Sequence, residues 1–234
     1  MQASLAVDLT GSGGKVVDEL APPDTWASKD NPDALRASLE ELAEGDAERE
    51  GVTNFFNESI GDQSVRFISI KRIESLSLWQ SYVAKRNQLQ KRARAEGLDE
   101  VAAEAYEHVW MFHGTVPDVI PKICSQGFNR SFCGRNAVRY GKGVYFATNS
   151  KYSNRYARPD SKGIKRMFLC RVAVGEYCMG KNELLVPYTR DASRNILYDS
   201  TTDSMSDKER DMFVVYHDAQ AYPEYLIEYQ ICDL

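Results

Sequence analysis

The chain has 234 residues, a length that suits one large domain or one domain with an extension. It is 43% apolar, so a sizeable core is expected. The net charge of −5 disfavours a role dominated by nucleic-acid binding. Because no run of about 18 apolar residues occurs, the sequence predicts no membrane span.

The charge divides the chain into an acidic head and a mildly basic body. Residues 1–50 hold 12 acidic and 4 basic residues, whereas residues 51–234 hold 22 and 25. Residues 1–30 are rich in Gly, Ser, Pro and Asp and predict a flexible acidic linker. A helix is expected from Asn31 to Gly45, which makes 31–50 a short helical lead-in. Residues 51–234 then form the main domain.

The sequence of the main domain predicts short strands and few helices. An alternating stretch at Ser64–Ile73 predicts a strand, and Leu76–Gly97 predicts the longest helix. Further strands are expected at Trp110–Phe112, Val144–Ala147, Met167–Val174, Met212–Tyr216 and Tyr225–Ile231, and helices at Asp118–Gln126 and Ser150–Tyr156. This order predicts an α+β fold with mostly antiparallel strands. Without a βαβ repeat or a G-x-G-x-x-G motif, no Rossmann unit is expected.

The cysteines and histidines indicate the cellular compartment and the absence of a metal site. The five cysteines have no CxxC spacing, which is typical of free thiols in a reducing compartment. The start of the chain lacks the basic and apolar regions of a secretory signal. An intracellular location, in cytoplasm or nucleus, is therefore expected. The three histidines lack metal-ligand spacing with the cysteines, so no metal is predicted.

Two motifs combine glycine with groups that could bind a ligand. In 112-FHGT-115, His113 could donate to a sugar hydroxyl, and Gly114 lets a ligand approach the backbone. In 139-RYGKGVYFA-147, glycines precede a strand carrying Tyr145, which could stack on a flat ring. Taken singly, a satisfied histidine at a strand end and a core tyrosine are the commoner interpretations.

Two more motifs lie further along the chain. In 152-YSNRYARPDSKG-163, Ser153 and Tyr156 are three residues apart, which puts them on one side of a helical turn. In 207-DKERDMFVVYHDAQAYPEYLI-227, Met212 stands where a charged loop becomes an apolar strand. Methionine there could simply fill a gap in the core.

Together the four motifs resemble the catalytic domain of the poly(ADP-ribose) polymerase family, the diphtheria-toxin-like ADP-ribosyltransferases. The likeness covers roughly residues 50–231 and is strongest to the mono-ADP-ribosylating branch that includes the macrodomain-bearing members. It implies a split, mostly antiparallel sheet with flanking helices. It also implies that NAD⁺ is consumed as a substrate, with no cofactor, and that 51–234 is a catalytic domain.

The resemblance gives residues of the first motif and its surroundings roles at several parts of NAD⁺. His113 matches the family histidine that bonds the adenosine-ribose hydroxyl. Gly114 matches the glycine whose backbone pairs with the nicotinamide carboxamide. Thr115 and Asn129 fall at positions near the ribose and phosphates.

The resemblance gives the next motifs the nicotinamide ring. Tyr145 and Tyr156 match the tyrosines on the two faces of nicotinamide, and Ser153 matches the serine that bonds the carboxamide oxygen. The loop after Tyr145 is expected to be the donor loop that covers NAD⁺.

Met212 falls at the third position of the family's catalytic triad, after His113 and Tyr145. Polymer-forming members carry glutamate there, which activates the next ADP-ribose for chain growth. A thioether has no donor and cannot act as a general base. The sequence therefore predicts transfer of a single ADP-ribose to protein acceptors, including the enzyme itself, with Glu or Asp as plausible acceptors.

Two alternatives stay open. Loss of the triad carboxylate would also suit a catalytically weak protein that binds NAD⁺ or ADP-ribose. A nucleic-acid ADP-ribosyltransferase is supported only by the basic helix around Lys85–Arg94, whose more common role is a solvated face. No zinc finger, WWE or macrodomain segment fits into residues 1–50, so a short family member or the catalytic part of a longer protein is expected.

Overall fold

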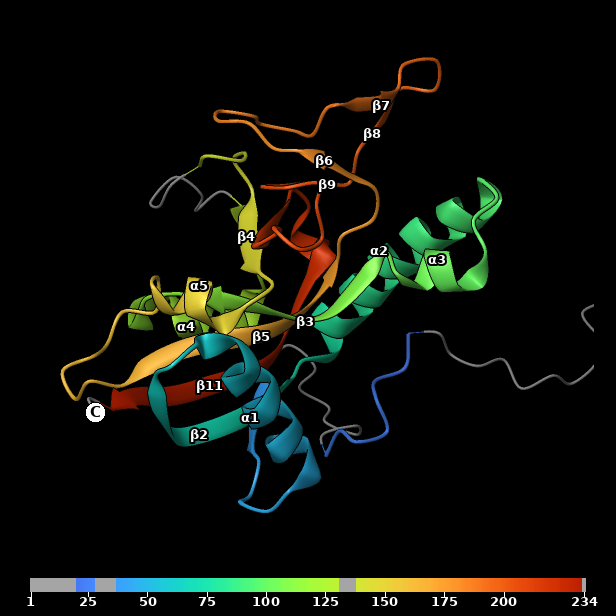
Figure 1. The fold of residues 1–234 in the computed structure, drawn as a ribbon. Helices are drawn as coiled ribbons and strands as arrows, with labels where there is room; N and C mark the ends of the chain where they lie inside the picture. Colours follow the sequence, from blue (N-terminus) through green and yellow to red (C-terminus); the bar gives the residue numbers. More distant parts are fainter. Residues whose placement is uncertain (1–19, 28–36, 131–137, 233–234) are drawn as a thin grey trace, which may run out of the picture.

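The computed structural model describes residues 20–27, 37–130 and 138–232 (Figure 1). The helices in this part are α1 (Ala47–Ile60), α2 (Leu76–Ala95), α3 (Glu100–Glu104), α4 (Ile120–Gln126) and α5 (Ser150–Asn154), with 3-10 turns η1 (Pro117–Val119) and η3 (Asp218–Gln220). The strands are β1 (Ser38–Glu41), β2 (Ser64–Glu74), β3 (Glu107–Gly114), β4 (Val144–Ala147), β5 (Lys165–Ala173), β6 (Tyr177–Met179), β7 (Thr189–Asp191), β8 (Ile196–Leu197), β9 (Ser200–Thr202), β10 (Met212–Val215) and β11 (Ala221–Cys232).

A nine-stranded sheet organises the described residues, in the order β1-β2-β11-β5-β3-β4-β10-β9-β6. Its pairs are antiparallel except β6 with β9. The parallel pair is joined through the β7–β8 hairpin, with no helix in the connection. The expected α+β class is confirmed, and this crossover is not a Rossmann unit.

The sheet is split between β3 and β4. A single residue pair, Phe112 with Ala147, joins the two strands. On one side β3 continues its pairing with β5 as far as Gly114, and on the other β4 pairs along its length with β10. The two halves therefore meet at one point, next to the His-Gly-Thr motif at the end of β3.

The expected helix from Asn31 to Gly45 is wrong over its described middle. Residues 38–41 form β1 and pair with β2, from Ser38 opposite Glu74 to Glu41 opposite Lys71. The first residues of that expected helix, 31–36, lie outside the described part. Spaced leucines favoured a helix, but pairing with an available strand edge decides the local structure. A helix does begin nearby, since Asp46 caps α1 with its side chain.

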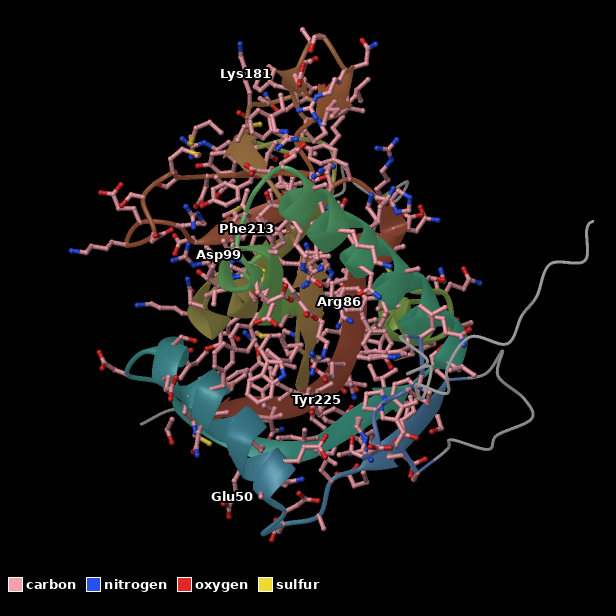
Figure 2. All side chains as sticks on the ribbon, turned by 90° about the vertical axis from the view of Figure 1, so that its right-hand side faces the viewer. Glu50, Arg86, Asp99, Lys181, Phe213 and Tyr225 are labelled. Atoms are coloured by element: carbon pink, nitrogen blue, oxygen red, sulfur yellow. The ribbon has the colours of Figure 1, made fainter. Side chains whose placement is uncertain are left out.

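Helix α1 covers one end of the sheet and α2 flanks its side, while β6–β9 lie at the opposite end (Figure 1). Glu50 on α1 and Lys181 after β6 mark these two ends in Figure 2. In the core between α1 and the sheet, Phe56 of α1 packs against Phe112 of β3 and Tyr229 of β11. Among the described helices, none combines the length and the apolar character needed to cross a bilayer.

Residues 20–27, within the stretch expected to be linker, lie against α2 and β11. Trp26 is only 6% exposed and contacts Trp79 and Tyr222, with ring centroids 5.8 and 6.1 Å away. The Trp79 indole N–H donates to the Ala21 carbonyl (2.8 Å). This short segment therefore closes an aromatic cluster of the domain.

Most other predicted elements are confirmed in place. The expected strand at 144–147 occurs with the predicted ends. The expected strands at 64–73, 110–112, 167–174, 212–216 and 225–231 and the helices at 76–97, 118–126 and 150–156 occur with shifted ends. Gly127, with φ 71°, ends α4 as expected. The expected donor loop after Tyr145 is wrong, because only Thr148 and Asn149 separate β4 from α5.

Candidate active site

His113 stands at the end of β3 with its ring fixed on both sides. Its Nδ1 lies 2.9 Å from the Tyr145 carbonyl oxygen. A carbonyl can only accept, so Nδ1 carries the proton and donates it. The rings of Phe128 and Phe146 lie 5.0 and 5.5 Å from the imidazole.

The environment of His113 sets its chemistry. Burial lowers the pKa of His113, and the Tyr145 bond opposes this effect only in part. The ring is therefore neutral near pH 7 and presents Nε2 as an acceptor. The sequence-based expectation of a donor to a sugar hydroxyl is thus replaced by an acceptor, which suits a ribose O–H equally well.

Gly114 lies where β3 meets α5 at closest approach. A Cβ atom at this position would stand 2.1 Å from the Ser153 carbonyl oxygen and 3.0 Å from the Ala157 nitrogen. The backbone at 114 can therefore approach α5 this closely only without a side chain. The close approach seen here is to α5, and the ligand contact expected at Gly114 stays a prediction.

Ser153 on α5 is 3% exposed and points toward β3. Its hydroxyl donates to the Phe112 carbonyl oxygen at 3.0 Å. The bond to a carboxamide oxygen that the family resemblance implies requires this hydroxyl to rotate away from Phe112.

The two predicted stacking tyrosines come from neighbouring elements, since α5 contacts both β3 and β4. The Tyr145 hydroxyl donates to the Gly141 carbonyl (2.8 Å) and accepts from the Tyr140 N–H (3.0 Å), which fixes its ring. Tyr156 follows α5, and its hydroxyl lies 3.3 Å from that of Tyr152. Both tyrosines are half-buried.

Met212 begins β10 and is 2% exposed. It pairs with Ala147 on β4, which in turn pairs with Phe112 on β3. Tyr145 lies two residues before Ala147, so it shares a sheet face with Met212. The structure thus brings the three triad positions onto adjacent strands at the split of the sheet.

Two further predicted residues have less defined surroundings. Thr115 follows β3 directly and is half-buried, whereas Asn129 lies after α4 and is exposed. Their roles near the ribose and phosphates remain predictions.

Two parts of the site were not predicted from sequence. Phe128 and Phe146 enclose His113, and the position of Phe146 inside the RYGKGVYFA motif could have signalled its part in this. Asp203 accepts hydrogen bonds from the Asp211 and Met212 N–H groups. Asp203 follows β9, a short strand whose only local signal is the β-branched pair Thr201-Thr202.

The basic face of α2 is largely neutralised within the chain. Arg92 pairs with Asp199, Arg94 with Glu100, and Arg86, which lies beside the sheet in Figure 2, with Glu107. These three cations therefore each have a carboxylate partner within the chain, and binding of nucleic acid by this helix stays a prediction.

A surface cavity of about 560 Å³ lies elsewhere, at the C-terminal end of α2. Its lining residues are Ala95, Glu96, Arg190, Asp191, Ala192 and Arg194. The charged groups pair with one another, Arg190 with Glu96 and Arg194 with Asp191. None of the predicted site residues reaches this cavity.

A split antiparallel sheet with histidine, tyrosine and an apolar residue on adjacent strands therefore defines the site. A sequence profile of the poly(ADP-ribose) polymerase catalytic domain matches residues 47–231. The chain belongs to this family.

Several relatives share this domain. Protein mono-ADP-ribosyltransferase PARP14 of Homo sapiens is 37% identical over 193 residues, which cover 81% of this chain and 10% of the relative. Protein mono-ADP-ribosyltransferase PARP12 of Mus musculus is 35% identical over 207 residues, covering 88% and 27%. Protein mono-ADP-ribosyltransferase PARP10 of Mus musculus is 33% identical, covering 81% and 19%. The chain thus spans only a fraction of the length of each of these three proteins.

Proposed function

We propose that this chain is a protein mono-ADP-ribosyltransferase, which cleaves NAD⁺ and transfers one ADP-ribose to an acceptor side chain. The observation that carries the proposal is Met212, buried at the start of β10 beside the strand of Tyr145. Its thioether can neither donate a hydrogen bond nor remove a proton. The names of the three relatives describe the same activity and support the proposal.

The groups around the split of the sheet suit the cleavage of NAD⁺. Nε2 of His113 would accept from a ribose hydroxyl, and the Gly114 backbone would bond the carboxamide. Tyr145 and Tyr156 would hold the nicotinamide ring between them, with Ser153 at its amide. Fixing the leaving ring and the ribose in one geometry lowers the entropic part of the barrier.

The electron balance of the step favours an ionised acceptor. The bond between C1′ and the nicotinamide nitrogen breaks, its electron pair neutralises the pyridinium ring, and positive charge builds on the sugar. A carboxylate of Glu or Asp then forms the new C1′–O bond with its own lone pair. Such an acceptor needs no base, which agrees with an apolar residue at position 212.

The test is mass spectrometry of purified protein incubated with NAD⁺, which reports chain length and modified residue together. We expect single ADP-ribose additions on acidic side chains, for the wild type and for Met212→Leu. Long ADP-ribose chains on the products would refute the proposal.

Substitutions at two histidines, one in the site and one outside it, distinguish an enzyme from a protein that only binds NAD⁺ or ADP-ribose. Loss of the ribose bond in His113→Ala should raise KM for NAD⁺ about tenfold to a hundredfold, the equivalent of about 1.5–3 kcal/mol. His217→Ala is the matched control, because His217 is exposed and bonds only locally, to Ala219. Equal labelling of wild type and His113→Ala would instead indicate a protein that binds NAD⁺ or ADP-ribose without transferring it.

A further inference from the structure

Asp203 directly follows β9 and lies next to Met212 at the start of β10. In the antiparallel pair of β9 and β10 the last registered pair is Thr202 with Phe213, and Asp203 is the next residue along the chain. Oδ1 of Asp203 accepts hydrogen bonds from the backbone N–H groups of Met212 and Asp211, both at 3.2 Å. The carboxylate therefore extends the ladder beyond the last backbone pair.

Asp211 links the same strand end to α5. Its Oδ1 accepts from the Asn149 side-chain amide at 2.8 Å. Asn149 is the N-cap of α5 and accepts from the Tyr152 N–H at 2.8 Å. Helix α5 positions Ser153 and leads into Tyr156. A continuous set of hydrogen bonds thus runs from Asp203 to the helix on the nicotinamide side of the site.

The Asp203 carboxylate is held by N–H groups rather than by a cation. Within the described ranges no lysine or arginine forms an ion pair with it, whereas Asp199 has Arg92 as its partner. The charge of Asp203 also acts on Tyr152 in α5. Burial and the hydrogen bond with Tyr156 are the main causes of the raised pKa of Tyr152, and the Asp203 charge adds to them.

We propose that Asp203 is a positioning residue for ADP-ribosyl transfer, which holds the start of β10 in place against α5. This role rests on the function proposed above, because it places the acceptor-side residue Met212 relative to the nicotinamide-side helix. Methionine makes no side-chain hydrogen bond of comparable strength that could fix its own strand end. The neighbouring strand provides this restraint through a carboxylate.

Two substitutions separate the positioning role from a general contribution to folding. Asp203→Ala removes the hydrogen bonds to β10, whereas Asp203→Asn keeps an amide oxygen that can accept them. NAD⁺ turnover is followed by nicotinamide release, and transfer by ADP-ribose bound to protein. Glu209→Gln, an exposed carboxylate in the same loop, is the charge-matched control.

We expect Asp203→Ala to keep KM for NAD⁺ within about twofold of wild type, since β3 and β4 are untouched. The fraction of released nicotinamide matched by protein-bound ADP-ribose should fall about tenfold or more, because water replaces a misplaced acceptor. Asp203→Asn should restore most of that fraction, and Glu209→Gln should leave it unchanged.

The opposite results are equally clear. If Asp203→Ala lowers nicotinamide release and transfer by the same factor, or if Asp203→Asn behaves like Asp203→Ala, the positioning role is wrong. A wild-type protein that releases no nicotinamide would refute the proposed function itself, and this role with it.

Discussion

Gly114 shows how one missing side chain lets a strand and a helix approach each other closely. Its position would put a Cβ atom 2.1 Å from the Ser153 carbonyl oxygen, a distance that only backbone movement can relieve. Because the blocking atom belongs to the main chain, a change of side-chain rotamer cannot relieve the clash. The residue therefore determines the spacing between β3 and α5.

Gly114→Ala should destabilise the protein by about 1–3 kcal/mol and lower transfer about a hundredfold, since β3 and α5 must separate. Urea unfolding and nicotinamide release measure the two effects. Gly51→Ala, in α1, is the matched control, because the added Cβ would meet no atom closer than the Trp110 ring, 3.5 Å away. That variant should be neutral or up to about 1 kcal/mol more stable. Equal behaviour of the two variants would contradict the proposed close approach.

At the scale of elements, the segment of residues 20–27 acts as part of the domain although it precedes the family match at residue 47. Beyond the Trp26 ring contacts, the Ala27 N–H donates to Glu74 (3.1 Å), and Arg72 donates to the Thr25 carbonyl (2.7 Å). These bonds tie the segment to the end of β2. Its contribution is to stability rather than to the chemistry of the site.

Trp26→Ala should lower the free energy of unfolding by about 3–5 kcal/mol, because it removes a large side chain from a packed aromatic cluster. Trp26→Phe retains much of the packing and should cost under about 1.5 kcal/mol. Urea titrations with a fixed-wavelength circular dichroism signal compare them. An unfolding midpoint of Trp26→Ala equal to that of the wild type would show that the segment does not stabilise the domain.

At the scale of the whole molecule, the histidines give stability a pH dependence. Burial is the main cause that lowers the pKa values of His108 and His113. Below about pH 6.5 the unfolded chain binds protons that the folded chain does not, so acid favours unfolding. Among the described carboxyl groups, Glu224 opposes this because burial raises its pKa.

The free energy of unfolding should therefore fall as the pH decreases from about 7.5 to 5.5, with the loss beginning near pH 6.5. Carboxylates with lowered pKa values, such as Glu96 and Glu228, lose their contribution only below about pH 4.5, so the two effects separate. Urea unfolding at several pH values measures this trend, and His108→Gln should reduce it. Unchanged stability across the interval would contradict the histidine account.

Long periodic patterns in the sequence predicted helices and strands well. Strands that depend on pairing with residues far along the chain could not be predicted from the sequence. Alternation along β2 and the apolar face of α2 were sufficient to place both. Strand β1 was mistaken for helix because its partner, β2, begins 26 residues after it. Strand β9 is three residues long and gains its order from pairing with β6 and β10.

By itself the sequence determined the family, the α+β class and the identity of the groups around the site. Motif order and side-chain type are local properties, so His113, Tyr145 and Met212 could be assigned before any contact was known. Only the tertiary structure decided that His113 presents an acceptor, since its Nδ1 proton is taken by a carbonyl 32 residues away. It also brought Asp203 to Met212, because hydrogen bonds between strands depend on register rather than on composition.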